Sequence, residues 1–285
     1  MWKRPSDPTI YGFETVDIDD LVDYLEEISA ASGKKITMTA YLAKCCADVI
    51  AQYPVLNAII IGNRVLQREN VDVFCQVAVA NKDGGSADLS GVKLGNAEEL
   101  GLVEIAERLH YRAAKVRKGQ DEEIEKTKSM IDKVPPLVLP TVMELFDFLT
   151  YVVPFDLGKL GIRDDPFGSI MVTNCAPFDI KLGFAPLVPS ARTPMVILPG
   201  VVGEYVFVED GKPVVKRGVQ ISMTFDHRCF DGLQIGIFVR EFRARLNRPR
   251  DYFPAPETFG EGPVKIEETR SSKAPPTPES KVHGA

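Results

Sequence analysis

The stretch Asp226-His227-Arg228-Cys229-Phe230-Asp231-Gly232 separates a run with strand alternation from a run with helical spacing. In the preceding run, Val219–Phe225, apolar residues occupy every second position, which predicts a half-buried strand. After the stretch, apolar residues recur at helical spacing: Ile235, Phe238, Val239, Phe242 and Leu246. We therefore expect His227 at the end of a strand. Asp231 is expected to cap the helix, because its carboxylate can accept hydrogen bonds from free backbone N–H groups.

This pattern, Asp-His-Arg-x-x-Asp-Gly and then a helix ending on Leu246-Asn247-Arg248-Pro249, resembles the acyltransferase catalytic core of the 2-oxo acid dehydrogenase complexes. That family shares its fold with chloramphenicol acetyltransferase. The resemblance implies a two-layer α/β domain with a mixed sheet covered by helices. It also implies a CoA-dependent acyltransferase, which moves an acyl group between a CoA thioester and a thiol or hydroxyl acceptor.

The resemblance implies roles for individual residues. In the family, the histidine that matches His227 is the general base, and a hydroxyl residue at the end of an earlier strand donates to the oxyanion. The stretch Phe167–Asn174 is similar to that strand and puts Thr173 at the hydroxyl position, with Ser169 a poorer choice. Acyl transfer from a thioester needs both groups, because a base must deprotonate the acceptor and a donor must hold the oxyanion.

Other polar residues of the motif have more than one interpretation. Asp231 is either a direct catalytic partner or, as the family precedent favours, part of a structural salt bridge to an arginine, for which Arg4 is a candidate. Arg228 is either a site-ordering ion pair or a solvated side chain. His110 lies among charged residues and is expected on the surface, and His283 belongs to the C-terminal tail.

Periodicity predicts further elements before the motif. Tyr11–Ile18 is expected to form a strand, and Asp19 or Asp20 to cap a helix that ends at Gly33. The other predictions are a helix from Thr37 or Thr39 to Tyr53, strands at Ala58–Ile61, Val65–Leu66 and Val71–Ala80, a loop at Lys82–Ser86, and a helix at about Ala97–Lys118 that begins with an Asn96/Glu99 capping box.

The resemblance covers two blocks of the chain. Val16-Asp17-Ile18 and Pro54-Val55-Leu56-Asn57 match the first block, and the second resumes at Phe167. In that second block, Pro194–Val202 and Val214–Gly218 are expected to pair as strands ahead of the histidine strand.

The sequence also departs from the family pattern. No lipoyl domain or subunit-binding domain precedes the core, so we expect no covalently bound lipoyl group on this chain. A segment at about 119–165 replaces a short link, and residues 81–93 are more polar than their family counterparts. We expect one catalytic domain at 1–253, with this segment inserted, and a disordered Pro- and Ser-rich tail at 254–285.

Within the inserted segment, Pro140 and Pro154 bracket a predicted amphipathic helix. Its apolar face carries Val142, Leu145, Phe146, Leu149 and Val153. The helix is too short to cross a bilayer, and its polar face lacks Lys and Arg for anionic lipid. We therefore expect residues 140–154 to pack on the domain, on a neighbouring subunit or on a partner protein.

Composition narrows the class of protein. The chain has 285 residues, 45% hydrophobic, and a formal charge of −6, which argues against a general nucleic-acid footprint. Its five cysteines lack Cys-x-x-Cys spacing, so neither a disulfide framework nor a zinc site is expected. No signal region or spanning helix is evident, and a reducing, cytoplasmic setting fits best.

The family precedent has a consequence for assembly. Because the histidine of one subunit meets the hydroxyl residue of its neighbour in the family, we expect a homotrimer or a larger particle built from trimers. The alternative function is a catalytically silent scaffold or assembly subunit that keeps the acyltransferase fold. An acyl-CoA turnover assay separates the two.

Overall fold

The computed structural model describes residues 7–61, 64–80, 87–117 and 165–259. Seven strands form its main sheet, in the order β1-β9-β7-β6-β4-β5, and β8 pairs with β9 alone. These strands are β1 (Thr9–Asp17), β4 (Val73–Ala80), β5 (Ala87–Leu94), β6 (Ile170–Val172), β7 (Met195–Pro199), β8 (Gly203–Glu209) and β9 (Lys212–Asp226). The sheet is mixed, because β6 runs parallel to both β4 and β7 while the other pairs are antiparallel.

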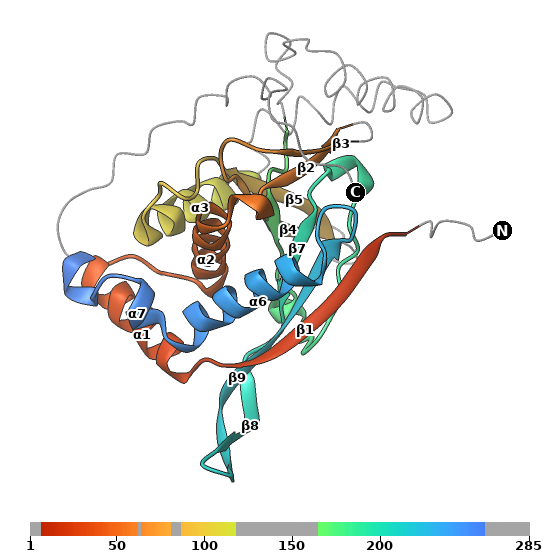
Figure 1. Ribbon diagram of the computed structural model, residues 1–285. Helices are drawn as coiled ribbons and strands as arrows, with labels where there is room; N and C mark the ends of the chain where they lie inside the picture. Colours follow the sequence, from red (N-terminus) through yellow and green to blue (C-terminus); the bar gives the residue numbers. More distant parts are fainter. Residues whose placement is uncertain (1–6, 62–63, 81–86, 118–164, 260–285) are drawn as a thin grey trace.

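Helices cover one face of this sheet, and the core lies between the two layers (Figure 1). The α-helices are α1 (Asp19–Ser32), α2 (Met38–Gln52), α3 (Leu102–Arg117), α6 (Gly232–Asn247) and α7 (Pro249–Tyr252). The 3-10 helices are η1 (Pro54–Leu56), η3 (Ala176–Phe178), η4 (Pro189–Ala191) and η5 (Pro256–Phe259). A separate hairpin joins β2 (Ala58–Ile61) to β3 (Arg64–Gln67). The predicted fold class, a two-layer α/β domain with a mixed sheet covered by helices, is confirmed.

Several predicted ends of helices are also confirmed. Thr37 caps α2, and its side-chain oxygen accepts a hydrogen bond from the Ala40 N–H at 3.2 Å. Gly33 ends α1 in the left-handed conformation, with φ of 64°, which favours glycine. The apolar residues predicted to face the core from α6 do so, since Phe238, Phe242 and Leu246 are buried.

The predicted cap of α1 is wrong. Ile18 occupies the N-cap position and makes no side-chain cap hydrogen bond, and the Asp19 N–H donates to Asp17 Oδ1 at 3.1 Å. The Asp19 carboxylate instead accepts a hydrogen bond from Arg217 Nε on β9 at 2.6 Å. The Asp19 side chain, which the local pattern assigned to the helix cap, therefore forms a long-range ion pair with Arg217.

The predicted start of α3 is also wrong. The helix begins at Leu102 and not at about Ala97. Asn96 has a left-handed φ of 51°, so it is not an extended N-cap residue. The Asn96 N–H donates to Asp72 Oδ1 at 3.0 Å, and its carbonyl accepts from the Glu99 N–H in a turn. The Asn/Glu spacing therefore belongs to a loop.

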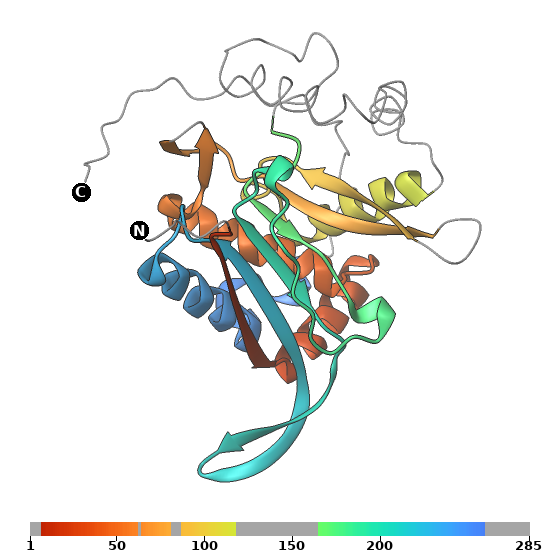
Figure 2. The same cartoon turned by 90° about the vertical axis from the view of Figure 1, so that its right-hand side faces the viewer.

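The strands of the second half pair differently from the prediction. Val214–Gly218 and the histidine strand form one continuous strand, β9, and its first half pairs with β8 rather than with β7. Strand β7 pairs with the second half of β9, with Met195 opposite Phe225. As a result, the β8–β9 hairpin projects beyond the sheet (Figure 2).

Strand β5, which overlaps the polar stretch 81–93, is an element that periodicity did not predict. It pairs with β4, with Gly91 opposite Gln76. A side chain at Gly91 would collide with the Phe74 ring, because a Cβ there would lie 2.1 Å from its nearest ring carbon. The polar residues of this stretch did not show strand alternation, and Gly91 leaves space for the Phe74 ring.

Other predictions fall outside the described residues. They are the loop at Lys82–Ser86, Arg4, most of the inserted segment, the predicted helix at 140–154, and the tail beyond Phe259. The described structure continues past residue 253, where Tyr24 Oη donates to the Pro254 carbonyl at 2.8 Å and η5 follows.

Candidate active site

His227 directly follows β9, as the sequence predicted, and its backbone is held from one side. The His227 N–H donates to the Pro8 carbonyl, ahead of β1, at 2.9 Å. On the other side of β9, the N–H of the preceding residue, Asp226, donates to the Pro194 carbonyl, ahead of β7, at 2.9 Å. The end of β9 is thus fixed between two neighbouring strands. The His227 side chain is exposed in the single chain.

A hydrogen bond orients the His227 ring. Its Nδ1 lies 2.9 Å from the Phe230 carbonyl oxygen. Because a carbonyl oxygen can only accept, Nδ1 carries the proton when the imidazole is neutral, and Nε2 keeps its lone pair. Nε2 is the atom that could accept a proton from a substrate.

Asp226 organises the turn that presents this carbonyl. Its backbone oxygen accepts from the Cys229 and Phe230 N–H groups at 3.0 and 3.1 Å. Its carboxylate accepts from the Arg228 N–H at 2.9 Å and from Arg228 Nη2 at 2.6 Å. This carboxylate holds the pKa of Arg228 above its usual value. Of the two readings of Arg228, the structure supports the ion pair.

Cys229 lies within the turn but is not poised as a nucleophile. Burial, together with the neighbouring Asp226 carboxylate, raises the pKa of its thiol to about 12. The thiolate is the reactive form, so this side chain stays protonated and unreactive near neutral pH.

Asp231 caps α6, as predicted. Its Oδ1 accepts from the Leu233 N–H at 2.8 Å and the Gln234 N–H at 3.2 Å. Gln234 Oε1 in turn accepts from the Asp231 N–H at 2.7 Å, which completes a capping box. The hydrogen bonds of this carboxylate thus go to the helix backbone. Arg4, the candidate salt-bridge partner, lies outside the described residues.

Thr173 directly follows β6, and its hydroxyl-bearing side chain is half-buried. Its N–H donates to the Ile197 carbonyl at 2.9 Å. Asn174 secures the next position, because Nδ2 donates to Thr39 Oγ1 at 3.3 Å and Oδ1 accepts from the Ala176 N–H at 2.9 Å. Ser169 is fully buried and donates to Asn57 Oδ1 at 2.5 Å, so it is engaged elsewhere.

The sheet keeps Thr173 and His227 apart within one chain. Thr173 comes one residue after Val172, which pairs with Ile197, so it is level with Leu198, which pairs with Ser222 on β9. At about 3.3 Å per residue, the five positions from Ser222 to His227 correspond to roughly 16 Å along the strand. The structure therefore does not bring these two predicted site residues together in one subunit.

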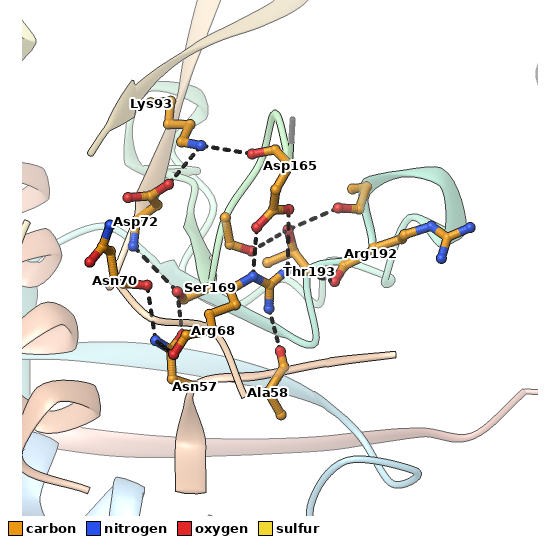
Figure 3. Close-up of polar contacts among 12 residues, drawn as sticks. Asn57, Ala58, Arg68, Asn70, Asp72, Lys93, Asp165, Ser169, Arg192 and Thr193 are labelled. Atoms are coloured by element: carbon orange, nitrogen blue, oxygen red, sulfur yellow. Dashed lines mark hydrogen bonds and ion pairs between the residues drawn. The ribbon is translucent and has the colours of Figure 1, made fainter. Parts of the chain in front are cut away.

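The remaining histidine among the described residues fits its prediction, since His110 is exposed on α3. Sequence reasoning missed a buried polar cluster beside the motif, which contains Arg68, Asp72, Lys93 and Asp165 (Figure 3). Arg68 and Asp165 are 97 positions apart. No local spacing could have indicated that they meet.

The fold and the oriented histidine define a class, a two-layer α/β domain with a hydrogen-bonded histidine at a strand end. A sequence model of the family "2-oxoacid dehydrogenases acyltransferase (catalytic domain)" matches residues 3–131 and 156–253. The chain belongs to this family. The internal stretch that the family model leaves unmatched, residues 132–155, lies inside the predicted insertion at about 119–165.

Curated relatives agree with this assignment. The chain is 24% identical, over 84% of its length, to the dihydrolipoyllysine-residue succinyltransferase component of the mitochondrial 2-oxoglutarate dehydrogenase complex of Saccharomyces cerevisiae. It is 22% identical, over 82% of its length, to the dihydrolipoyllysine-residue acetyltransferase component of the acetoin cleaving system of Bacillus subtilis. These matches cover 42% and 48% of the two relatives, so the chain spans less than half of their length.

Solved structures share the fold. The cubic core of the pyruvate dehydrogenase complex matches with a TM-score of 0.62 at 19% identity, covering 86% of this chain and 84% of that chain. A probable dihydrolipoamide acetyltransferase from Listeria monocytogenes 4b F2365 matches with a TM-score of 0.62 at 17% identity, covering 87% and 88%. Within the part of the chain that the structure describes, no helix is long and apolar enough to cross a membrane.

Proposed function

We propose that the protein is a CoA-dependent acyltransferase that moves an acyl group between a CoA thioester and a thiol or hydroxyl acceptor. His227 is the general base. The observation that carries the proposal is the contact from His227 Nδ1 to the Phe230 carbonyl oxygen at 2.9 Å, which leaves Nε2 free to accept a proton. The cytoplasmic setting suggested by the free cysteines is part of this proposal.

The reaction is balanced with these groups alone. Nε2 of His227 takes the proton of the acceptor thiol or hydroxyl, and the resulting anion forms a bond to the thioester carbonyl carbon. The Thr173 hydroxyl donates to the oxyanion of the tetrahedral intermediate. The carbon–sulfur bond to CoA then breaks, and the CoA sulfur takes the proton back from the imidazolium. Acyl-CoA is the donor substrate, and free CoA leaves as the second product.

A second copy of the chain completes this site. Thr173 and His227 lie at opposite ends of the sheet in one subunit, so one copy supplies the base and its neighbour the hydroxyl group. A trimer, or a particle built from trimers, satisfies this requirement with closed symmetry. The cubic core of the pyruvate dehydrogenase complex has the same fold, which supports an assembly of this kind.

A similar solved structure supports the residue types chosen for the site. The dihydrolipoamide acetyltransferase of Azotobacter vinelandii, with a TM-score of 0.61 at 19% identity, was investigated for a serine, a histidine and an asparagine in its catalytic mechanism. Its histidine and asparagine are four positions apart, as are His227 and Asp231. Asp231 acts in our proposal through the helix cap, which fixes the turn that carries the Phe230 carbonyl.

An acyl-CoA turnover assay tests the proposal. The purified protein is mixed with acetyl-CoA or succinyl-CoA and dihydrolipoamide, free thiols or alcohols, and CoA release is followed. His227→Ala should lower the rate by about a hundredfold to ten-thousandfold, because a positioned base is lost. His110→Ala, on the exposed face of α3, is the matched control and should retain the wild-type rate. Wild-type turnover by His227→Ala would refute the assignment.

The same assay weighs the scaffold alternative. If the wild-type protein assembles but releases no CoA with any acyl donor and acceptor pair, a catalytically silent assembly subunit becomes the better function. Light scattering supplies the second measurement. A monomer at working concentration with full activity would refute the shared site.

A further inference from the structure

Arg68 directly follows the last residue of the β2–β3 hairpin, Gln67. It is the centre of the polar cluster of Figure 3. Its Nε donates to Asp165 Oδ2 at 2.6 Å, and its Nη2 donates to Asp165 Oδ1 at 3.2 Å. Such a two-pronged pair fixes the guanidinium plane as well as its position. Arg68 is 8% exposed, so water competes little for these bonds.

The rest of the guanidinium binds backbone. Nη1 donates to the Ala58 carbonyl on β2, and Nη2 also donates to the Arg192 carbonyl at 3.3 Å. The Arg192 side chain returns the contact, because its Nη1 donates to the Ile60 carbonyl at 3.2 Å. The hairpin and the loop at 192–194 are thus joined by hydrogen bonds in both directions.

The backbone of the partner residue, Asp165, is held by a second contact. Lys93 Nζ on β5 donates to the Asp165 carbonyl at 2.8 Å and pairs with Asp72 Oδ2 at 2.6 Å. The cluster therefore holds two cations and two carboxylates, and its formal charge is zero. Arg68 and Asp72 are buried, and Lys93 and Asp165 are partly buried. Such an ion pair adds little net stability, because the desolvation of its charges offsets their attraction.

The loop at 192–194, which Arg68 binds, also contacts the residue before His227. The Pro194 carbonyl at the end of this loop accepts from the Asp226 N–H at 2.9 Å, and Asp226 builds the turn that presents the Phe230 carbonyl to His227. Arg68 also lies close enough to the motif for its charge to oppose the rise in the pKa of Cys229. The cluster and the motif are therefore neighbours in space.

We propose that Arg68 is a positioning residue for the acyl-transfer reaction, because it fixes the loop at 192–194 against which the Asp226–Phe230 turn and the His227 ring are set. This inference rests on the proposed function for its kinetic consequence. The predicted effect of Arg68 on the position of the His227 ring does not depend on the proposed function. Arg68 touches no reacting atom.

The test replaces one buried arginine at a time. Arg68→Lys keeps a single charged contact with Asp165 but cannot also reach the Ala58 and Arg192 carbonyls. Arg245→Lys is the matched control, because Arg245 is also buried and paired, with Glu241 and Gln52, but lies near the C-terminal end of α6. Asp165→Asn is a second variant that removes the carboxylate charge without changing its shape.

The first readout is independent of activity. In protein labelled with ¹⁵N-histidine, correlation spectra at a pH where imidazoles are neutral report which ring nitrogen carries the proton. The chain has three histidines, and His227→Gln identifies the signal. We expect wild type and Arg245→Lys to hold the proton on Nδ1, and Arg68→Lys and Asp165→Asn to give a mixture of both tautomers.

The second readout is the split between kcat and KM. Arg68→Lys and Asp165→Asn should lower kcat by about tenfold to a hundredfold with little change in the KM for acyl-CoA, because misplacing a reacting group slows chemistry. Arg245→Lys should lower the melting temperature without lowering kcat. Wild-type tautomer and kcat in both cluster variants would overturn the proposal. Failure of both to fold would also overturn it, since the cluster would then serve stability alone. A wild-type protein without turnover would refute the proposed function but leave the spectroscopic test in force.

Discussion

Arg228 and Asp226 bind each other across the histidine that separates them in the sequence. The guanidinium is 61% exposed while the carboxylate is 8% exposed, and Arg228 Nη2 lies 2.6 Å from Asp226 Oδ2. The buried Asp226 carboxylate therefore organises the turn, and the exposed Arg228 guanidinium neutralises the charge of that carboxylate.

Asp226→Asn should weaken acyl transfer without unfolding the domain. The amide keeps the shape and can still accept from the Arg228 N–H, but it loses the charge that holds the guanidinium. We expect kcat to fall by up to about a hundredfold, because the turn that orients His227 loosens. Steady-state kinetics with circular dichroism measures this. An unchanged kcat would mean that the backbone contacts of the turn suffice.

The Thr173 hydroxyl can be tested by two substitutions of opposite character. Thr173→Val keeps the shape and removes the donor, so kcat should fall by about a hundredfold to a thousandfold. Thr173→Ser keeps the donor and should stay within a few fold of wild type. If Thr173→Val were as active as Thr173→Ser, another group would hold the oxyanion.

Mixing inactive variants tests the shared site. Under the proposal, co-assembly of His227→Ala subunits with Thr173→Val subunits recreates some sites with one intact base and one intact hydroxyl group. Activity should reappear after the two proteins are dissociated and reassembled together. Each variant reassembled alone is the control. No recovery from a mixed assembly, confirmed by mass spectrometry, would show that both residues act within one subunit.

The helix cap should contribute to stability as well as to activity. Asp231→Ala removes Oδ1, which accepts both side-chain hydrogen bonds at the start of α6, and should cost about 1 kcal/mol. For a domain of this size that corresponds to roughly 2–4 °C in melting temperature. Asp231→Asn should retain most of this stability, since Asn caps helices as well as Asp. Equal melting temperatures for Asp231→Ala and wild type would contradict the cap.

Cys229 should resist alkylation in the native protein. With a thiol pKa of about 12 the thiolate fraction near neutral pH is smaller than that of a free cysteine by on the order of a thousandfold. Because the native pKa is raised to about 12, reactivity should still be increasing with pH where the labelling of a free cysteine has levelled off. Iodoacetamide labelling followed by mass spectrometry measures it. Rapid labelling of Cys229 at pH 7 would show that the turn opens.

The elements on either side of the inserted segment, α3 and the residues from Asp165 onward, both bind Lys93. They should therefore stay in place when the segment is removed. Arg112 Nη1 on α3 donates to the Lys93 carbonyl at 3.0 Å, and Lys93 Nζ donates to the Asp165 carbonyl at 2.8 Å. Replacing residues 119–164 by a Gly/Ser linker should leave the catalytic fold intact and change oligomer size or partner binding. Light scattering and turnover measure the outcome. If assembly, partner binding and activity stayed the same, the segment would be a decorated loop.

The motif was predictable because its geometry is local. Strand alternation up to Phe225 and helical spacing after Gly232 left few positions for His227, and the Asp231 cap depends only on the three residues after it. The same local reasoning failed where a distant partner took the side chain. Asp19 was expected at a helix cap, but Arg217, 198 positions away, binds it. The cluster around Arg68 had no local signal at all.

The β8–β9 hairpin has a consequence for how the protein behaves before it assembles. Val206 and Val215 pair across the two strands and are 67% and 62% exposed, and Val208 is 75% exposed. An unshielded apolar ribbon of this kind is a template for edge-to-edge aggregation. Newly made subunits should therefore be prone to stick to one another in the wrong register. Refolding by dilution from denaturant should therefore give a higher yield at low protein concentration than at high protein concentration.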